Sequence, residues 1–125
     1  MASVQSLIPI YTTKGDVGAL LFYPHLYNQQ GEWIGWVTSD RQVYSVHGQY
    51  VGWVISEPRI LRKPADAFER PYRQPPFQPT RIRVLPQYPL APMMPELTRD
   101  VVDVLDEMPD LLPTVDFGEL RQDMD

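Results

Sequence analysis

The chain has 125 residues, a formal net charge of −5, 14 prolines and no cysteine. This length leaves room for one domain and a tail, and the lack of cysteine excludes disulfides, thiolate metal sites and cysteine nucleophiles. No apolar run approaches the roughly 18 residues of a membrane span, and the first nine residues lack the pattern of a signal peptide. We therefore expect a soluble, cytoplasmic protein without contact to a membrane.

A repeated sequence motif occupies residues 7–63. In each copy an apolar residue and a tyrosine precede a polar turn that ends in glycine, and a second strand follows. The two clearest copies begin at Tyr27 and Tyr44, a period of 17 residues (44 − 27), and a weaker copy begins at Tyr11. A fourth, incomplete copy falls at residues 59–63. The pattern predicts a mainly β fold, in which a small antiparallel meander of some seven strands forms about four repeated hairpins.

Glycine occupies two kinds of position in this repeated motif. Gly15, Gly31 and Gly48 end the polar turns, where a three-residue hairpin loop needs a positive φ. Gly35 and Gly52 lie within the return strands, where a missing side chain indicates that a large ring or another backbone passes close by. All five glycines are therefore predicted to have structural roles.

The return strand of the second copy is apolar on both sides. Strict alternation places Trp33, Gly35 and Val37 on one side and Ile34 and Trp36 on the other. A sheet with one solvated face would alternate apolar and polar residues instead. We expect neighbouring hairpins to cover the second face.

Residues 64–95 form a different kind of segment. Ten of the 14 prolines lie between residues 58 and 95, and they interrupt any helix or strand ladder. An extended, polyproline-like chain is expected there, with a domain boundary near residue 64 where limited proteolysis would leave a folded N-terminal part. Seven basic residues between Arg59 and Arg83 could meet an anionic surface or the acidic end of the chain, but their loose spacing favours simple solvation.

The last segment, residues 96–125, is an acidic tail with two basic and ten acidic residues. The negative net charge of this segment argues against binding of nucleic acid by this end of the chain. Apolar residues recur at helical spacing between Pro95 and Pro109, which predicts an amphipathic helix over residues 96–108. This helix either packs on its own domain or docks on a partner, and the sequence favours neither.

The repeated hairpins, the reduced last strand and the Pro-rich segment together resemble the bacterial 4-fold beta flower family. The resemblance rests on Tyr11, Gly15, Tyr27, Gly31, Gly35, Tyr44, Gly48, Gly52 and Leu61. It implies four short hairpin petals around a pseudo-fourfold axis. It implies no activity, and no catalytic residue is carried over from it.

No set of nucleophile, base and orienting group is visible, so we expect a protein that is not an enzyme and has neither metal nor cofactor. The candidate binding residues are aromatic or basic: Trp33, Trp36, Trp53, Tyr50, Arg62 and Lys63. Exposed aromatic rings bind sugars, bases or Pro-rich peptides, but we favour the interpretation that these rings form the core of a small domain.

Two functions remain at this point. The first is a structural or protein-interaction module whose Pro-rich and acidic segments dock a protein partner or a second copy of the chain. The alternative is binding of a small ligand or glycan by exposed tryptophan and tyrosine side chains of the repeats.

Overall fold

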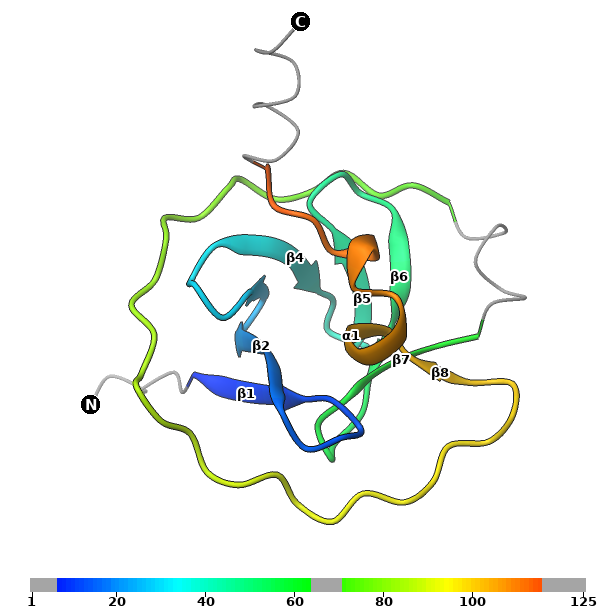
Figure 1. Cartoon of the computed structure of the whole chain (residues 1–125). Coiled ribbons are helices and arrows are strands. Elements are labelled where there is room, and N and C mark those ends of the chain that lie inside the picture. The colour runs from blue at the N-terminus through cyan, green and yellow to red at the C-terminus, as the bar shows by residue number, and fades with distance from the viewer. Residues whose placement is uncertain (1–6, 64–70, 116–125) are drawn as a thin grey trace, which may run out of the picture.

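The computed structural model of the chain describes residues 7–63 and 71–115. It contains one antiparallel sheet of eight strands, in which each strand pairs with its neighbours along the chain. The predicted mainly β meander is confirmed (Figure 1). The strands are β1 (Ile8–Tyr11), β2 (Val17–Phe22), β3 (His25–Tyr27), β4 (Trp33–Val37), β5 (Gln42–Ser45), β6 (Tyr50–Val54), β7 (Ile60–Arg62) and β8 (Val102–Asp103).

The strands pair as four hairpins, which we call petals. The first three petals are the consecutive pairs β1–β2, β3–β4 and β5–β6. In the fourth petal, β7 pairs with β8, so that Leu61 lies opposite Asp103 and Arg62 opposite Val102. The incomplete fourth copy of the sequence is thus completed by a strand from far along the chain.

The turn glycines adopt the predicted conformation. Gly15, Gly31 and Gly48 have φ values of 96°, 83° and 86°. In the first petal the amide of Gly15 donates to the carbonyl of Thr12 at 2.9 Å, and the amide of Thr12 donates to the carbonyl of Asp16 at 2.7 Å. The other two turns repeat these bonds, because only glycine adopts the left-handed backbone without strain.

A bulge follows the turn in each of the first three petals. In the second petal Leu26 lies opposite Gly35 but Tyr27 lies opposite Trp33, so Ile34 is an extra residue without a partner. The register shifts at the corresponding positions of the first and third petals. A bulge of this kind turns the side chains that follow it to the other face of the sheet.

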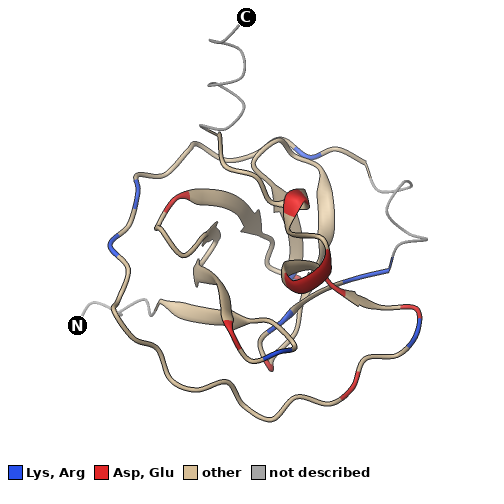
Figure 2. Ribbon diagram, in the orientation of Figure 1, with Lys and Arg blue, Asp and Glu red and all other residues tan. Residues whose placement is uncertain are grey.

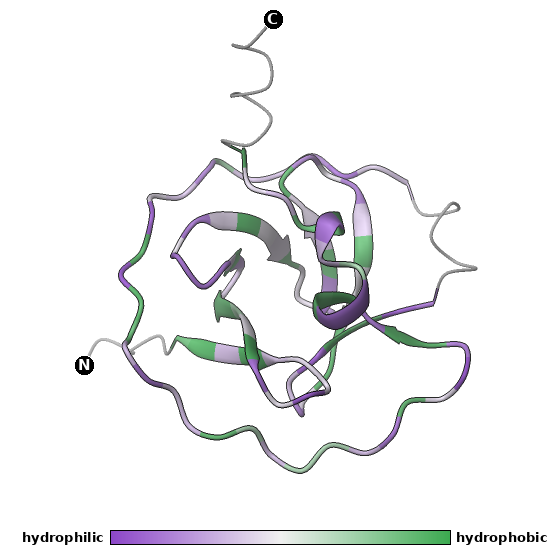
Figure 3. Cartoon of the chain, in the orientation of Figure 1, coloured by the Kyte–Doolittle hydropathy of each residue, from purple (hydrophilic) through white to green (hydrophobic). Residues whose placement is uncertain are grey.

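The bulge makes the expected alternation in the second petal wrong. Ile34 and Val37 belong to an inner apolar cluster, whereas Trp33 and Trp36 belong to an outer one. The sheet therefore separates two cores. The inner core contains mainly aliphatic side chains, and the outer core is rich in aromatic ones. Green segments along the strands in Figure 3 mark the most hydrophobic residues.

The inner core is built from equivalent positions of the four petals. The apolar residue before each tyrosine position is at most 1% exposed in every petal: Ile10, Leu26, Val43 and Ile60. On the last petal Val104, the first residue of helix α1 (Val104–Glu107), is fully buried in the same cluster. Helix α1 and the 3₁₀ turn η2 (Pro109–Leu111) cover part of the inner face.

The helix is much shorter than the predicted 96–108. Its beginning is set by Asp103, which belongs to β8 and accepts a hydrogen bond from the amide of Asp106 as N-cap. Its end is set by Pro109, because the residue before a proline is disfavoured in helical conformation, and Met108 has φ −137° and ψ 49°. Pairing with β7 thus replaces the first half of the expected helix.

Residues 71–95 form an extended belt that encircles the petals (Figure 1). The belt passes the turn glycines of three petals in reverse order, at intervals of nine residues (82 − 73 and 91 − 82). Amides of the belt donate to two of these glycines, at 2.9 Å and 3.1 Å. The contacts pair Arg73 with Gly48, Ile82 with Gly31 and Ala91 with Gly15.

The predicted extended state of the Pro-rich segment is confirmed for the described residues, and its role is to cover the outer core. Ile82, Val84 and Tyr88 pack against the outer cluster, and the hydroxyl of Tyr11 donates to the carbonyl of Pro89 at 2.6 Å. The belt, rather than neighbouring hairpins alone, explains why both faces of the sheet are apolar.

Candidate functional site

The aromatic candidates lie mainly in the outer core. Trp33, Trp36 and Tyr50 are buried, and Trp53 is half-buried. The indole of Trp36 donates to the carbonyl of Ser45 at 3.1 Å and stacks on the ring of Tyr44 at 4.9 Å between centroids. Burial places the first three side chains in the core rather than on a ligand-binding surface.

Arg73 of the belt covers this aromatic pair. Its guanidinium carbon lies 5.4 Å from the ring centre of Tyr44 and 5.8 Å from that of Trp36. Both distances are within the range of cation–π attraction. Cation–π contacts therefore fix the belt to the outer core in addition to its backbone hydrogen bonds with the turn glycines.

The two basic candidates differ in their surroundings. Arg62 is buried and donates to the carbonyls of Tyr50 and Val51 at 3.2 Å and 2.8 Å; burial lowers the pKa of its guanidinium. Lys63 is exposed, and its ammonium lies 3.9 Å from a carboxylate oxygen of Asp100. Arg62 thus joins β6 to β7, while Lys63 remains accessible from solvent.

The glycines within the return strands are explained by backbone contacts. A Cβ atom on Gly52 would lie 1.9 Å from the carbonyl oxygen of Leu61, and one on Gly35 would lie 2.5 Å from that of Tyr44. Such distances are far below van der Waals contact. The prediction that a ring or another backbone passes these positions is confirmed, and the passing group is the backbone of the next petal.

A buried polar network, which the sequence did not indicate, closes the ring of petals. The guanidinium of Arg59 is 1% exposed and donates to Glu57, to Thr13 Oγ1 at 3.0 Å and to the carbonyl of Pro95 at 3.1 Å. Its Nε lies 3.0 Å from a carboxylate oxygen of Glu57. The only hint in the sequence is that Arg59 occupies the position that Gln42 holds in the third copy.

Asp103 completes this network. One carboxylate oxygen accepts from the amide and the hydroxyl of Thr13, both at 2.6 Å. The other accepts from the amide of Asp106 at 3.3 Å. The network connects the turn of the first petal, the split fourth petal and the end of the belt, so its role is to hold the closed ring together.

The described residues contain no group of three or more metal-ligating side chains. No helix in the part of the chain that the structure describes has the length and apolar character needed to cross a bilayer. His25 lies edge-on to Trp33 at 6.1 Å, and burial lowers the pKa of its imidazole.

The outer side of the belt carries several large apolar side chains, and we call them the outer rim. Phe77, Leu90 and Met93 are 98%, 95% and 97% exposed, and Tyr72 and Leu85 are more than half exposed. Single exposed apolar side chains are common on protein surfaces, and what distinguishes these five is that all of them lie on one ordered, extended segment. They project from a backbone that the inward contacts already hold in place.

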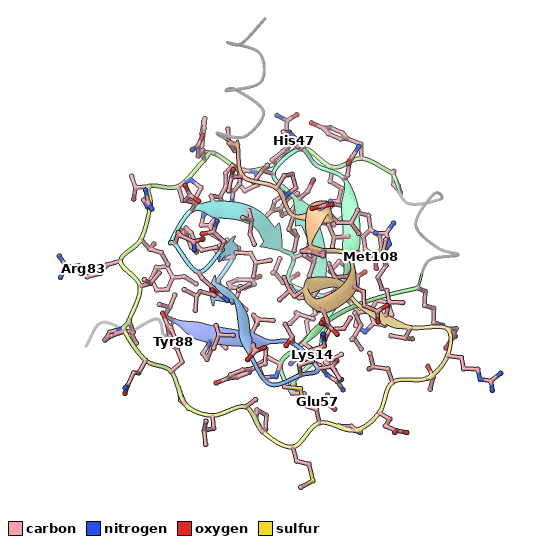
Figure 4. All side chains as sticks on the ribbon, viewed as in Figure 1. Lys14, His47, Glu57, Arg83, Tyr88 and Met108 are labelled. Carbon is pink, nitrogen blue, oxygen red and sulfur yellow. The ribbon has the colours of Figure 1, made fainter. Side chains whose placement is uncertain are left out.

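The belt that carries the outer rim is also basic. Residues 71–95 contain three arginines, Arg73, Arg81 and Arg83, and no acidic residue. The acidic residues lie elsewhere in the chain, and those of α1 are red in Figure 2. Arg83 points away from the petals and Tyr88 points toward them, so the belt has an inner, packed side and an outer, free side (Figure 4).

The fold defines a class of small all-β proteins in which four hairpins surround a pseudo-fourfold axis. The sequence model of a family described as "4-fold beta flower protein" matches residues 8–99, and the chain belongs to this family. The matched range includes the belt as well as the first seven strands. No curated protein and no solved structure matches the chain.

Proposed function

We propose that this chain is a non-enzymatic β module that binds another protein through the outer rim. The observation that carries the proposal is the nearly complete exposure of Phe77, Leu90 and Met93 on a belt whose backbone is held by the petals. Side chains fixed in this way lose little backbone entropy on binding, because the order already exists in the free protein.

The proposed partner has an apolar surface with acidic groups near it. The rim offers apolar side chains together with Arg81 and Arg83, and no carboxylate lies among residues 71–95. Complementary charge would orient such a partner and speed its association.

The acidic segment after the belt contributes less to this surface. Val104 is fully buried, and Leu105 and Leu111 pack against the inner core. The apolar face of α1 is thus occupied within the chain. The Pro-rich segment, rather than the helix, supports the docking role.

The second candidate function, binding of a glycan or small ligand by exposed tryptophans, has weaker support. It needs accessible rings, and the indoles of Trp33 and Trp36 are buried. Trp53 is half-buried, which leaves one partly accessible ring rather than a platform.

Site-specific photo-crosslinking in cells tests the proposed function. A crosslinking amino acid at position 77 or 90 should capture a defined protein, and the same amino acid at position 49, on an exposed hairpin turn, should not. The triple variant Phe77→Ser, Leu90→Ser, Met93→Ser should keep the unfolding temperature of the parent but lose binding of the purified partner. Unchanged binding by this variant would contradict the proposal.

A further inference from the structure

A pocket of about 360 Å³ lies where the petals join. The three joints between successive petals of the first seven strands contribute to it: Tyr23 between β2 and β3, Thr38, Ser39 and Arg41 between β4 and β5, and Ile55, Ser56 and Pro58 between β6 and β7. The ends of β2, β4 and β6 supply its floor through Leu21, Val37 and Val54. We call it the axial pocket, because it is shared by the bases of successive petals.

The axial pocket is an opening in the inner core. Its floor residues belong to the same cluster that α1 and η2 cover nearer the hairpin turns, where Leu105 lies 3.0 Å from the position of a Cβ on Gly18. No residue of α1, of η2 or of the belt lines the pocket. Among the described residues, the C-terminal segment thus covers the inner core in one region, while the axial pocket adjoins the inner core in another.

The lining combines an apolar interior with a polar mouth. Ile8 and Tyr23 are 41% and 46% exposed although they are large apolar side chains beside the pocket. Thr38, Ser39 and Ser56 bring hydroxyl groups to it. An apolar cavity of this size with a few polar groups is the usual form of a small-molecule site.

Arg41 supplies the one charge in this lining. Its backbone is fixed, since its amide donates to the carbonyl of Thr38 and its carbonyl accepts from the amide of Val54, each at 3.0 Å. Its φ of 69° is a left-handed conformation that arginine rarely adopts. Among the described residues, no carboxylate lies within ion-pair distance of its guanidinium.

The carboxylate nearest to Arg41 in sequence is that of Asp40, which accepts a hydrogen bond from the hydroxyl of Thr38. Asp40 does not line the pocket. The pocket therefore has an apolar floor, hydroxyl groups and one cationic residue, Arg41, that forms no ion pair with a carboxylate of the described residues. From this arrangement we infer that the axial pocket binds an apolar carboxylate, with the hydrocarbon part on the floor and the carboxylate paired with Arg41.

The test uses the full chain, decanoate as the probe and 1-decanol as its uncharged match. Titration followed by amide chemical shifts should give saturable changes at Leu21, Val37, Val54 and Ser56, with decanoate bound at least tenfold more tightly than decanol. Arg41→Asn should remove this preference, because asparagine tolerates the left-handed backbone but lacks the charge. Arg99→Asn is the matched control, since Arg99 is exposed and lies outside both the pocket lining and the belt, and it should leave the preference unchanged.

A second variant blocks the pocket without altering the core. Ser56 is exposed at the mouth, and Ser56→Trp should weaken both probes at least tenfold. Three results would overturn the inference: no saturable change, equal affinity for the two probes in the parent chain, or changes confined to the outer core. Shifts at the lining that grow with protein concentration alone would instead mark contact between two copies and would also overturn it.

Discussion

The contact between the belt and the petals makes a quantitative prediction at the turn glycines. Gly15 and Gly31 have the same kind of positive φ, 96° and 83°. They differ in what a Cβ atom would meet: at Gly15 the nearest belt atom is 4.0 Å away on Ala91, whereas at Gly31 the carbonyl oxygen of Ile82 is 2.2 Å away. Gly15→Ala therefore perturbs the backbone conformation alone, and Gly31→Ala perturbs the backbone conformation and the belt.

The expected losses of unfolding free energy follow from these contacts. Gly15→Ala should lower it by about 1–2 kcal/mol, the penalty of a left-handed backbone. Gly31→Ala should add the loss of the hydrogen bond from the amide of Ile82 to Gly31, about 0.5–1.5 kcal/mol. It should also lose part of the burial of the Ile82 side chain, about 1–2 kcal/mol. The total for Gly31→Ala is about 3–5 kcal/mol.

Urea and thermal unfolding, followed by tryptophan fluorescence, measure this difference. An excess of about 2–3 kcal/mol corresponds to a difference in unfolding temperature of roughly 10–20 °C for a domain of this size. Ile82→Ala in both backgrounds provides a control, because its effect should shrink once Gly31→Ala has displaced the belt. If the two alanine variants unfold within about 0.5 kcal/mol of each other, the belt does not contribute to stability at this turn.

Three other predictions concern the cores and the network. Asp103→Ala should lower the unfolding free energy by about 2–4 kcal/mol in urea unfolding, because it removes an N-cap and two further hydrogen bonds; a loss below about 1 kcal/mol would rule out the closing role. In single-tryptophan variants, iodide should quench Trp53 more than Trp36, and equal quenching would contradict the burial of Trp36. Burial lowers the pKa of His25 from 6.5, so the unfolded state binds the proton more readily and stability should fall as the pH drops below about 6.5. Urea midpoints between pH 7.5 and 5.5 should therefore fall more for the parent than for His25→Gln, and parallel curves would refute this cause.

The local parts of the fold could be predicted from the sequence. The turn glycines and the seven strands of residues 7–63 follow from signals within a few residues of one another, such as Gly31 at the end of a polar turn. The close approach at Gly52 was also foreseeable, because a glycine inside a strand often marks a place where another backbone or a ring comes near. The identity of the approaching group could not be predicted, since it lies on the next petal.

The parts that were missed depend on contacts between distant residues. Val102 and Asp103 form β8 only because β7 offers an unpaired edge, and their apolar spacing matches a helix instead. The bulge at Ile34 exchanges the faces of the strand, although no residue type there marks it. The path of the belt depends on a few contacts at turns, such as that of Ile82 with Gly31, which leave little trace in composition.

The candidate site residues likewise divide into those whose surroundings the sequence predicts and those whose surroundings depend on distant contacts. Burial of Trp33 and Trp36 agrees with the core interpretation drawn from their repetition. The buried state of Arg62 was not foreseeable, since its partners are backbone carbonyls of β6. The axial pocket is assembled from three separate joints between petals, so no single stretch of sequence predicts it.

The split fourth petal has a consequence for how the protein is made. During synthesis β7 leaves the ribosome 42 residues before its partner (103 − 61), which takes about 2–8 seconds at 5–20 residues per second. Through that interval three petals exist while Val104, which completes the inner core, does not yet. The nascent chain must therefore keep an aliphatic surface from aggregating until its last quarter emerges.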